Sequence, residues 1–268
     1  MSKNSHSIRL MAGVFDFQVI AREGNARCGT LSTPHGTVQT PAFMPVGTRG
    51  AVKAIMHRDL IDLGAQIILA NTYHLHLRPG TELIERLGGL HRFISWDRPI
   101  LTDSGGYQVF SLATRRTVEE QGVRFRSHLD GEEHLLTPEG ATEIQWSLGS
   151  DVAMVFDECV PYPCDASDVR RAMERTLRWA ERARLRFKAL RETGVGTNPG
   201  QVQFGIVQGG VHRNLRAISE RQTVALGFDA YAIGGLSVGE PVPVMYDVVA
   251  ETAPRLPAEC PRYLMGAG

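Results

Sequence analysis

Three polar side chains follow short apolar stretches of this sequence, where they are placed to recognise a ligand. Asp103 follows PILT, Asp157 follows DVAMVF, and Gln208 follows VQFGIV. One carboxylate accepts two neighbouring N–H donors in a bidentate pair, and a carboxamide both donates and accepts hydrogen bonds. These residue types are suited to gripping the edges of a planar heterocycle that presents N–H and carbonyl groups.

Glycines and one aromatic residue accompany the polar positions. The residues after the first aspartate are Ser104, Gly105, Gly106 and Tyr107, and Gly235 and Leu236 follow the apolar stretch DAYAI. Glycine lets the backbone approach a flat ligand closely, and a tyrosine ring stacks on one. The alternative is that Asp103 only caps a helix and that these segments are ordinary barrel loops.

Metal and cofactor sites are weaker predictions. His74 and His76 are two residues apart, but no carboxylate is suitably spaced, so structural histidines are favoured. The four cysteines form no CxxC pair, which predicts reduced thiols rather than a zinc knuckle, and no histidine is placed by sequence to activate Cys159. No GxGxxG follows the first strand and GxxxxGK[ST] is absent. The sequence therefore favours hydrogen bonding and stacking to a base.

Charge gives no clear indication of a nucleic-acid partner. The 268 residues include 29 basic and 29 acidic side chains, so the formal net charge is zero. The longest predicted helix, about Ser167–Leu190, is rich in arginine. We favour a solvated face with i,i+4 ion pairs, and a phosphate-binding surface is the alternative. No signal-peptide core and no run of about 18 apolar residues occurs, so a cytoplasmic location without a membrane span is expected.

The elements that must position these residues form a repeating pattern. Apolar runs lie at 42–46, 66–70, 99–102, 151–156, 202–207, 229–235 and 262–266, and amphipathic segments lie at 51–63, 80–87, 138–148, 166–192, 211–226 and 241–253. Such β-then-α units imply parallel strands with right-handed crossovers. In α/β barrels the catalytic groups lie at the C-terminal ends of the strands. The pattern predicts one (β/α)8 barrel domain over 1–268, with the polar residues gathered at one end.

Two additions to the barrel are expected. Alternation of apolar and polar residues between glycines and prolines over about 1–41 predicts an antiparallel sheet. The segment 107–136 is too long for a simple connection, and VRFRSHLDGEEHLLT within it predicts a hairpin turning at Asp130-Gly131. We interpret this segment as an insertion on the catalytic face.

Eight segments resemble successive signature blocks of tRNA-guanine transglycosylases of the queuine and preQ1 type. They are TPAFMPVGTRGAVKA, ILANTYHLHLRPG, WDRPILTDSGGYQVFSL, SHLDG, LGSDVAMVFDEC, FGIVQGG, YAIGGLSVGE and RYLMGAG, in family order. The resemblance implies a (β/α)8 barrel with an N-terminal antiparallel sheet and a C-terminal zinc subdomain. It also implies a pentosyltransferase that exchanges guanine at the tRNA wobble position for a 7-deazaguanine by double displacement.

The resemblance implies a role for each candidate residue. Asp103 matches the proton-accepting aspartate, and Asp157 matches the residue that grips the N–H and NH2 edge of the base. The other matches are Gln208 and the Gly235 backbone at the ring carbonyl, Tyr107 and Met265 on the two ring faces, and the Leu236 backbone at the deazaguanine substituent. Ser104, Gly105 and Gly106 lie in the same loop as Asp103, near the ribose or base.

Two positions resemble the bacterial form of the family. Cys159 and Val238 match residues that narrow the pocket for preQ1, where eukaryotic relatives make room for queuine. The residues Gly266, Ala267 and Gly268 match the start of a tRNA-contacting loop.

The family's nucleophilic aspartate and its Cys-x-Cys-x2-Cys…His zinc site follow that loop in the family and have no match here. We therefore expect a chain that stops before the last barrel strand and is inactive by itself, without zinc of its own. The full-length parent is expected to bind Zn2+, tRNA and preQ1 or guanine and to be a homodimer.

Three alternatives stay open. The first is a non-catalytic deazaguanine-binding or partner subunit. An unrelated barrel lyase or decarboxylase is disfavoured because no lysine or metal cluster follows the strands. A fragment that aggregates through open strand edges is the last alternative.

Overall fold

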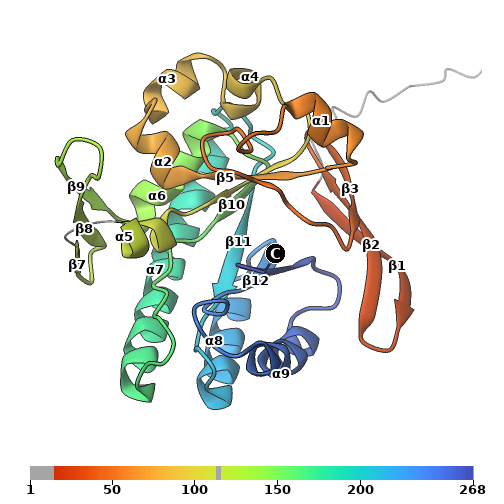
Figure 1. Cartoon of the computed structure of the whole chain (residues 1–268), viewed down its shortest axis with the longest axis vertical. Helices are drawn as coiled ribbons and strands as arrows, with labels where there is room; N and C mark the ends of the chain where they lie inside the picture. Colours follow the sequence, from red (N-terminus) through yellow and green to blue (C-terminus); the bar gives the residue numbers. More distant parts are fainter. Residues whose placement is uncertain (1–14, 113–115, 268) are drawn as a thin grey trace, which may run out of the picture.

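The centre of the molecule is a curled parallel sheet with helices on its outer side (Figure 1). The structure, a computed structural model, describes residues 15–112 and 116–267. The parallel strands are β4 (Val46–Gly47), β5 (Ile68–Asn71), β6 (Ile100–Asp103), β10 (Val152–Met154), β11 (Val202–Val207), β12 (Ala230–Ile233) and β13 (Arg262–Leu264). They lie side by side in chain order, all parallel. Doubly wound sheets reverse their strand order, whereas this order is that of a barrel, so the predicted fold class is confirmed.

The helices follow the strands that they cover. They are α1 (His57–Asp62), α2 (Thr72–Leu77), α3 (Thr81–Arg86), α4 (Leu90–Ile94), α5 (Gly106–Leu112), α6 (Pro138–Leu148), α7 (Ala166–Thr193), α8 (Arg213–Ala225) and α9 (Val242–Thr252), with a 3-10 turn η1 (Ala253–Arg255). The bounds of α6 are set by local chemistry. Thr137 Oγ1 accepts from Gly140 N at 3.0 Å, and Gly149 ends the helix in the left-handed region.

Alternate residues of the strands pack on opposite sides of the sheet. On β5, Ile68 and Ala70 belong to the buried cluster under the helices, whereas Leu69 belongs to the cluster inside the curl. Every residue of β11 is buried. The centre of the sheet is therefore covered on both faces, as expected for parallel strands.

Two predicted boundaries are wrong. The expected strand at 42–46 is shorter and later, because β4 begins at Val46, directly after Pro45. Pro41 and Pro45 have no N–H to donate to a sheet. The expected helix at 51–63 is only α1. Short helices α2, α4 and α5, which were not predicted, follow strand ends or turns and carry no full amphipathic period.

The N-terminal antiparallel sheet contains β1 (Asp16–Glu23), β2 (Ala26–Thr33) and β3 (Gly36–Thr40), and residues 1–14 of its predicted range lie outside the described residues. We call the group that joins it to the barrel the Asp151 clamp: Asp151, His35 and His91. Nδ1 of His35 lies 2.8 Å from one oxygen of Asp151, and Nε2 of His91 lies 3.0 Å from the other. The two imidazole rings stack with centroids 3.5 Å apart.

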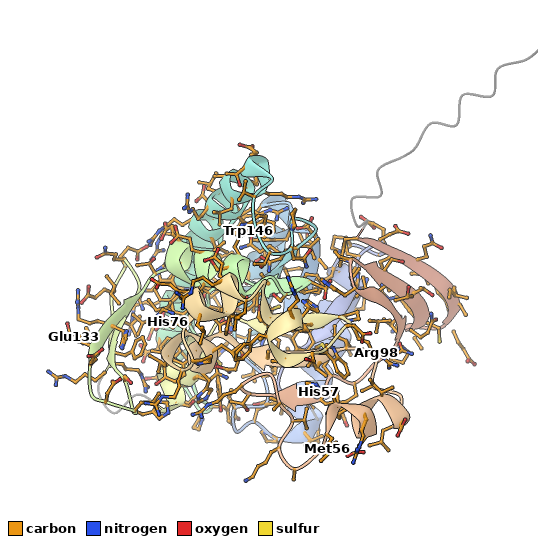
Figure 2. All side chains as sticks on the ribbon, turned by 90° about the horizontal axis from the view of Figure 1, so that it is seen from above. Met56, His57, His76, Arg98, Glu133 and Trp146 are labelled. Atoms are coloured by element: carbon orange, nitrogen blue, oxygen red, sulfur yellow. The ribbon has the colours of Figure 1, made fainter. Side chains whose placement is uncertain are left out.

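The predicted insertion forms a three-stranded antiparallel sheet of β7 (Arg116–Val118), β8 (Val123–Arg126) and β9 (Glu133–Leu136). The turn at Asp130-Gly131 is confirmed, with Gly131 at φ 79°. Strand β7 was not predicted, and residues 113–115 lie outside the described part of the chain. Figure 2 shows His76 of α2 on the side of the barrel that faces this sheet, with Glu133 further out. The phenol of Tyr73, also on α2, lies 2.9 Å from Nδ1 of His128, next to the turn.

The arginines of α7 pair mainly with other elements. Arg178, Arg182 and Arg186 bind Glu120, Glu139 and Glu143, and the buried Arg184 binds Asp229. Among the described ion pairs of α7, Arg170–Glu174 has the expected i,i+4 spacing. The predicted solvated face is thus present, but most of its ion pairs do not have the predicted i,i+4 spacing, because the glutamates come mainly from the insertion and from α6. None of the helices within the described ranges has the length and apolarity that a membrane crossing requires.

Candidate functional site at the carboxyl ends of the strands

Asp103 ends β6 and is held by its neighbours on β5 and α2. Its carboxylate accepts from Asn71 Nδ2 at 2.8 Å, from the Thr72 backbone N–H at 3.2 Å and from Gly105 N at 3.3 Å. Burial raises the pKa of Asp103 to about 7, against the lowering effect of these hydrogen bonds, and the charge of Asp157 adds to the rise. A carboxyl group with this pKa gains and releases a proton near neutral pH, as a general acid or base must.

Asp157 and Gln208 form a buried pair just beyond the ends of β10 and β11. Asp157 is 6% exposed, and its Oδ2 accepts from Gln208 Nε2 at 2.7 Å. Burial raises the pKa of Asp157 to about 6, and the bond from Gln208 works in the opposite direction. A carboxylate and an amide thus lie side by side at neighbouring strand ends, ready to contact hydrogen-bonding groups of one ligand.

Two glycines let the backbone approach this pair. A Cβ at Gly106 would lie 2.7 Å from the Asp157 carbonyl oxygen, and a Cβ at Gly235 would lie 2.2 Å from Gln208 Oε1. Gly235 also has φ 64°, a conformation that side chains disfavour. The loops after β6 and β12 can therefore close on Asp157 and Gln208 only with glycine at these positions.

Comparison of the sequence with known proteins identifies one family. The sequence matches the family described as Queuine tRNA-ribosyltransferase over residues 22–268. The chain belongs to the queuine tRNA-ribosyltransferase family. A relative of that name from Pelotomaculum thermopropionicum is 58% identical over 243 residues, which cover 91% of this chain and 63% of the relative. Relatives of the same name from Desulforudis audaxviator and Koribacter versatilis are each 54% identical, over 94% and 96% of this chain and 66% and 68% of their own lengths.

This family member thus spans less than two thirds of the length of the first of these relatives. The described residues include the strand ends from β4 to β13. Asp103, Asp157, Gln208 and Gly235 lie at the ends of β6, β10, β11 and β12, which are neighbours in the sheet. The sequence-predicted polar residues are therefore brought together at one edge.

The structure also places the other residues that the sequence predicted for the pocket. Ser104 and Leu236 are buried at 3% and 4% exposure, and Ser104 Oγ accepts from Gly106 N at 3.4 Å. Tyr107 is 54% exposed. The sulfur of Met265 lies 3.5 Å from the position that a Cβ on Gly234 would occupy, so this side chain borders the same loop.

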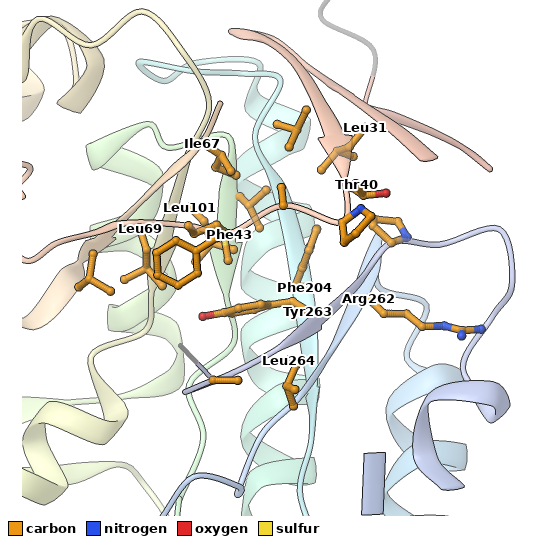
Figure 3. Close-up of a pocket in the computed structure, with 18 of the residues that line it drawn as sticks. Leu31, Thr40, Phe43, Ile67, Leu69, Leu101, Phe204, Arg262, Tyr263 and Leu264 are labelled. Atoms are coloured by element: carbon orange, nitrogen blue, oxygen red, sulfur yellow. The ribbon is translucent and has the colours of Figure 1, made fainter. Parts of the chain in front are cut away.

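The end of the described chain borders the loop after β12. Gly266 and Ala267 line a cavity beside β4 and β13 (Figure 3), a Cβ at Gly266 would lie 3.5 Å from the Leu236 carbonyl oxygen, and Gly268 lies outside the described residues. The predicted RNA contacts of these three residues stay predictions.

Cys159 is a poor nucleophile in this family member. Burial raises the pKa of its thiol to about 12, and the negative charge of Asp157 adds to the rise. The reactive form of cysteine is the thiolate, which is scarce at such a pKa. The weak prediction of a nucleophilic cysteine thus loses its chemical basis.

Sequence reasoning missed Arg216, on α8. Its guanidinium is buried and donates to the carbonyls of Val207 at 3.0 Å, Gly210 at 2.7 Å and Gly235 at 3.3 Å. Burial lowers its pKa to about 10. Through these hydrogen bonds, the buried Arg216 side chain holds the loops after β11 and β12 in place. Asn71 was also missed, although it follows the apolar run QIILA as Asp103 follows PILT.

The described residues do not fit the family's cysteine-rich zinc site. The two groups of nearby metal-ligand atoms in the described ranges contain none of the four free cysteines. One group is the Asp151 clamp. Both of its imidazoles hydrogen-bond the Asp151 carboxylate, at 2.8 Å and 3.0 Å, which accounts for this grouping without an ion. We derive no chemistry through zinc from these residues.

Proposed function

We propose that this chain provides the base-binding pocket of a transglycosylase that exchanges guanine at the wobble position of tRNA for preQ1. The single observation that supports this most strongly is the convergence of Asp103, Asp157, Gln208 and Gly235 at four neighbouring strand ends. Family membership supplies the reaction class, and the donor and acceptor pattern of these groups fits guanine and 7-deazaguanines.

Each polar group has a proposed part in base recognition. Asp157 accepts hydrogen bonds from the ring N–H and the NH2 group of the base. Gln208, whose amide now donates to Asp157 at 2.7 Å, turns to the ring carbonyl together with the backbone N–H of Gly235. An entering base replaces one buried hydrogen bond with several. Tyr107 and Met265 cover the two faces of the ring, and Ser104, Gly105 and Gly106 form the floor near the ribose.

Asp103 has the proposed role of proton carrier. With a pKa raised to about 7, it protonates the departing guanine and accepts the proton that the incoming base loses. Asn71 and Thr72 hold its carboxylate at the strand end while the bases exchange.

The preference for preQ1 over queuine rests on Cys159, Val238 and the backbone of Leu236. A side chain larger than glycine at 238 limits the room for a cyclopentenediol, which favours the small aminomethyl substituent. We further propose a cytoplasmic location, tRNA as the macromolecular substrate, contacts to it through 266–268, and a homodimer and a zinc site in the full-length family protein.

Calorimetry with guanine and preQ1 tests the pocket. Binding to the wild type and an enthalpy near zero for Asp157→Ala support the proposal. Asp62→Ala, which removes an exposed carboxylate on α1, is the matched control and should bind like the wild type. Equal binding by Asp157→Ala would place the base elsewhere and overturn the proposed pocket.

Exchange of radiolabelled guanine into tRNA tests catalysis. We expect the 268 residues alone to incorporate no label above background, because in this proposal Asp103 carries protons and Asp157 grips the base, so that neither carboxylate is left to attack the ribose. Base binding without exchange would favour the second candidate function, a non-catalytic deazaguanine-binding subunit. Incorporation by the chain alone would refute the expected inactivity.

A further inference from the structure

Four histidines lie between helix α2 and the insertion sheet (Figure 2). His74 and His76 are on α2, His128 is in the turn after β8, and His134 is on β9. The rings of His74 and His128 meet edge to face with centroids 5.7 Å apart, and those of His76 and His134 do so at 6.2 Å. We call these four residues the histidine interface. A charge on its rings therefore acts directly on the contact between the barrel and the insertion.

The contacts of the histidine interface suit neutral rings. The Tyr73 ring stacks on His128 with centroids 5.6 Å apart, in addition to the 2.9 Å bond from its phenol, and Phe125 stacks on His134 at 5.4 Å. A charged group without a counter-ion is costly in such apolar surroundings. The interface is therefore most stable when its imidazoles carry no proton charge.

Two buried ring nitrogens of the interface are left without hydrogen bonds. They are Nδ1 of His74 and Nε2 of His134, for which the described residues provide no partner. An unpaired buried polar atom costs free energy that water recovers when the contact opens. The docked insertion is therefore held against a standing tendency to separate from α2.

The charges around the inner pair, His74 and His128, oppose protonation. Burial lowers the pKa of His74, and the positive charges of His128 and Arg49 add to the lowering. A proton on either ring of this pair places one cation beside another. The inner pair is therefore the more sensitive part of the interface.

The outer pair, His76 and His134, is partly compensated. Burial lowers the pKa of His76, and His134 adds to the lowering. Carboxylate oxygens of Asp130 and Glu132 lie within 4.8 Å of a ring nitrogen of His134. These carboxylates stabilise a charged His134, so protonation of the outer pair is less disruptive.

The other side of the insertion is attached to α7 by groups that keep their charge. The Glu120 carboxylate accepts from Nε and Nη2 of Arg178 at 2.6 Å and 2.8 Å, and its backbone carbonyl accepts from Trp179 Nε1 and Arg182 Nη1, each at 2.8 Å. The hydrogen bonds from Arg178 lower the pKa of Glu120. This attachment therefore does not change between pH 8 and pH 5.

Helix α2 connects the histidine interface to the pocket. Its first residues include Thr72, whose N–H donates to Asp103 at 3.2 Å, and a Cβ at Gly105 would lie 3.1 Å from Tyr73 Cβ. A change in the docking of the insertion therefore reaches the residues that hold Asp103.

We propose that the histidine interface is a pH-dependent contact that docks the insertion on α2 when its rings are neutral and releases it when they take up protons, while Glu120 keeps the insertion attached to α7. Because the pKa of His74 is lowered in the docked state, the released state binds more protons. Docking is thus complete above the ordinary histidine value of 6.5 and is lost as pH falls below it. One histidine that takes up its proton only after release raises the opening constant about tenfold between pH 7.5 and pH 5.5.

Amide hydrogen exchange of the intact chain, read by mass spectrometry and corrected for the intrinsic pH dependence of exchange, tests the proposal. The opening constant of amides at 123–126 and 133–136 should rise about tenfold or more from pH 7.5 to pH 5.5. Amides of β11, at 202–207, should keep their protection. A flat profile for the insertion, or equal loss of protection in β11, would overturn the proposal. No base is added, so this outcome is independent of the proposed pocket.

Variants assign the response to the inner pair. His74→Phe combined with His128→Asn keeps a ring at one position and a hydrogen-bonding group at the other, and the pH response should disappear. His212→Asn, at the start of α8, removes a histidine outside the interface and should respond like the wild type. An unchanged response in the double variant would contradict the assignment.

A single surface change provides a second test that leaves all four rings in place. Arg49→Gln removes a cation that acts on His74, so the docked state tolerates a proton more easily and the release should move to lower pH. A release at the same pH as in the wild type would count against the proposed role of His74.

Discussion

Asp151 is expected to be the most costly single carboxylate to replace in this chain. Its side chain is fully buried and accepts four hydrogen bonds, from His35 Nδ1 at 2.8 Å, His91 Nε2 at 3.0 Å, the Ile100 N–H at 2.9 Å and the His35 N–H at 3.3 Å. Asp151→Asn keeps one acceptor oxygen and turns an NH2 group toward buried donors. Removing one partner of a buried, charge-assisted network costs about 3–5 kcal/mol.

Guanidinium denaturation at pH 7, followed by tryptophan fluorescence, measures this loss in the free energy of unfolding. Asp62→Asn, on exposed surface, is the control and should change stability by less than about 0.5 kcal/mol. A loss below about 1 kcal/mol for Asp151→Asn would refute the reasoning, because it would mean that the clamp contributes little.

The pH dependence of the stability difference tests the same reasoning. Burial acts to raise the pKa of Asp151, but hydrogen bonds from His35 and His91 outweigh it and lower the pKa to about 2. A lowered pKa in the folded state adds stability above the unfolded value near 3.8, and this contribution is lost as pH falls through about 2. The shift corresponds to roughly 2 kcal/mol. The stability difference between wild type and Asp151→Asn should therefore shrink between pH 4 and pH 2.

Further outcomes concern the pocket. Guanine affinity, measured by calorimetry, should fall as pH drops below about 6, where Asp157 becomes protonated and loses acceptor capacity; a flat profile from pH 7.5 to pH 5 would contradict its role. Gly235→Ala should abolish base binding, because its Cβ would lie 2.2 Å from Gln208 Oε1, whereas Gly194→Ala, strained in φ but with nothing within 4 Å, should bind normally. Iodoacetamide at pH 8 should label Cys28, which is exposed, well before Cys159, whose thiol has a pKa of about 12; mass spectrometry showing the reverse order would refute this assignment.

The parts of the fold that the sequence predicted are those with local signals. The runs VQFGIV and PILT are apolar and short, and a polar residue follows each one, so both the strand and the residue at its end were readable. The Asp151 clamp had no local signal, since its aspartate and His35 are 116 positions apart. Arg216 lies on an amphipathic helix, where an arginine usually faces water, and only the folded structure shows its three carbonyl partners.

The insertion shows the same limit. Its turn was readable from Asp130-Gly131, but β7 depends on pairing with β8, in which Arg116 lies opposite Phe125. The arginines of α7 likewise find glutamates 43 to 58 positions away. Pairing across such distances leaves no periodicity in the sequence.

The two buried carboxyl groups of the pocket reduce the folding stability of the protein when no base is bound. The pKa values of Asp103 and Asp157 are raised to about 7 and about 6, so the folded chain binds protons more tightly there than the unfolded chain does. Each group therefore lowers folding stability as pH rises from about 4 through its folded pKa. Neutral side chains at both positions would increase the folding stability of the chain, but the pocket would then no longer bind the base. A base that donates hydrogen bonds to Asp157 relieves this penalty in part, so the ligand should raise the melting temperature more at pH 8 than at pH 5.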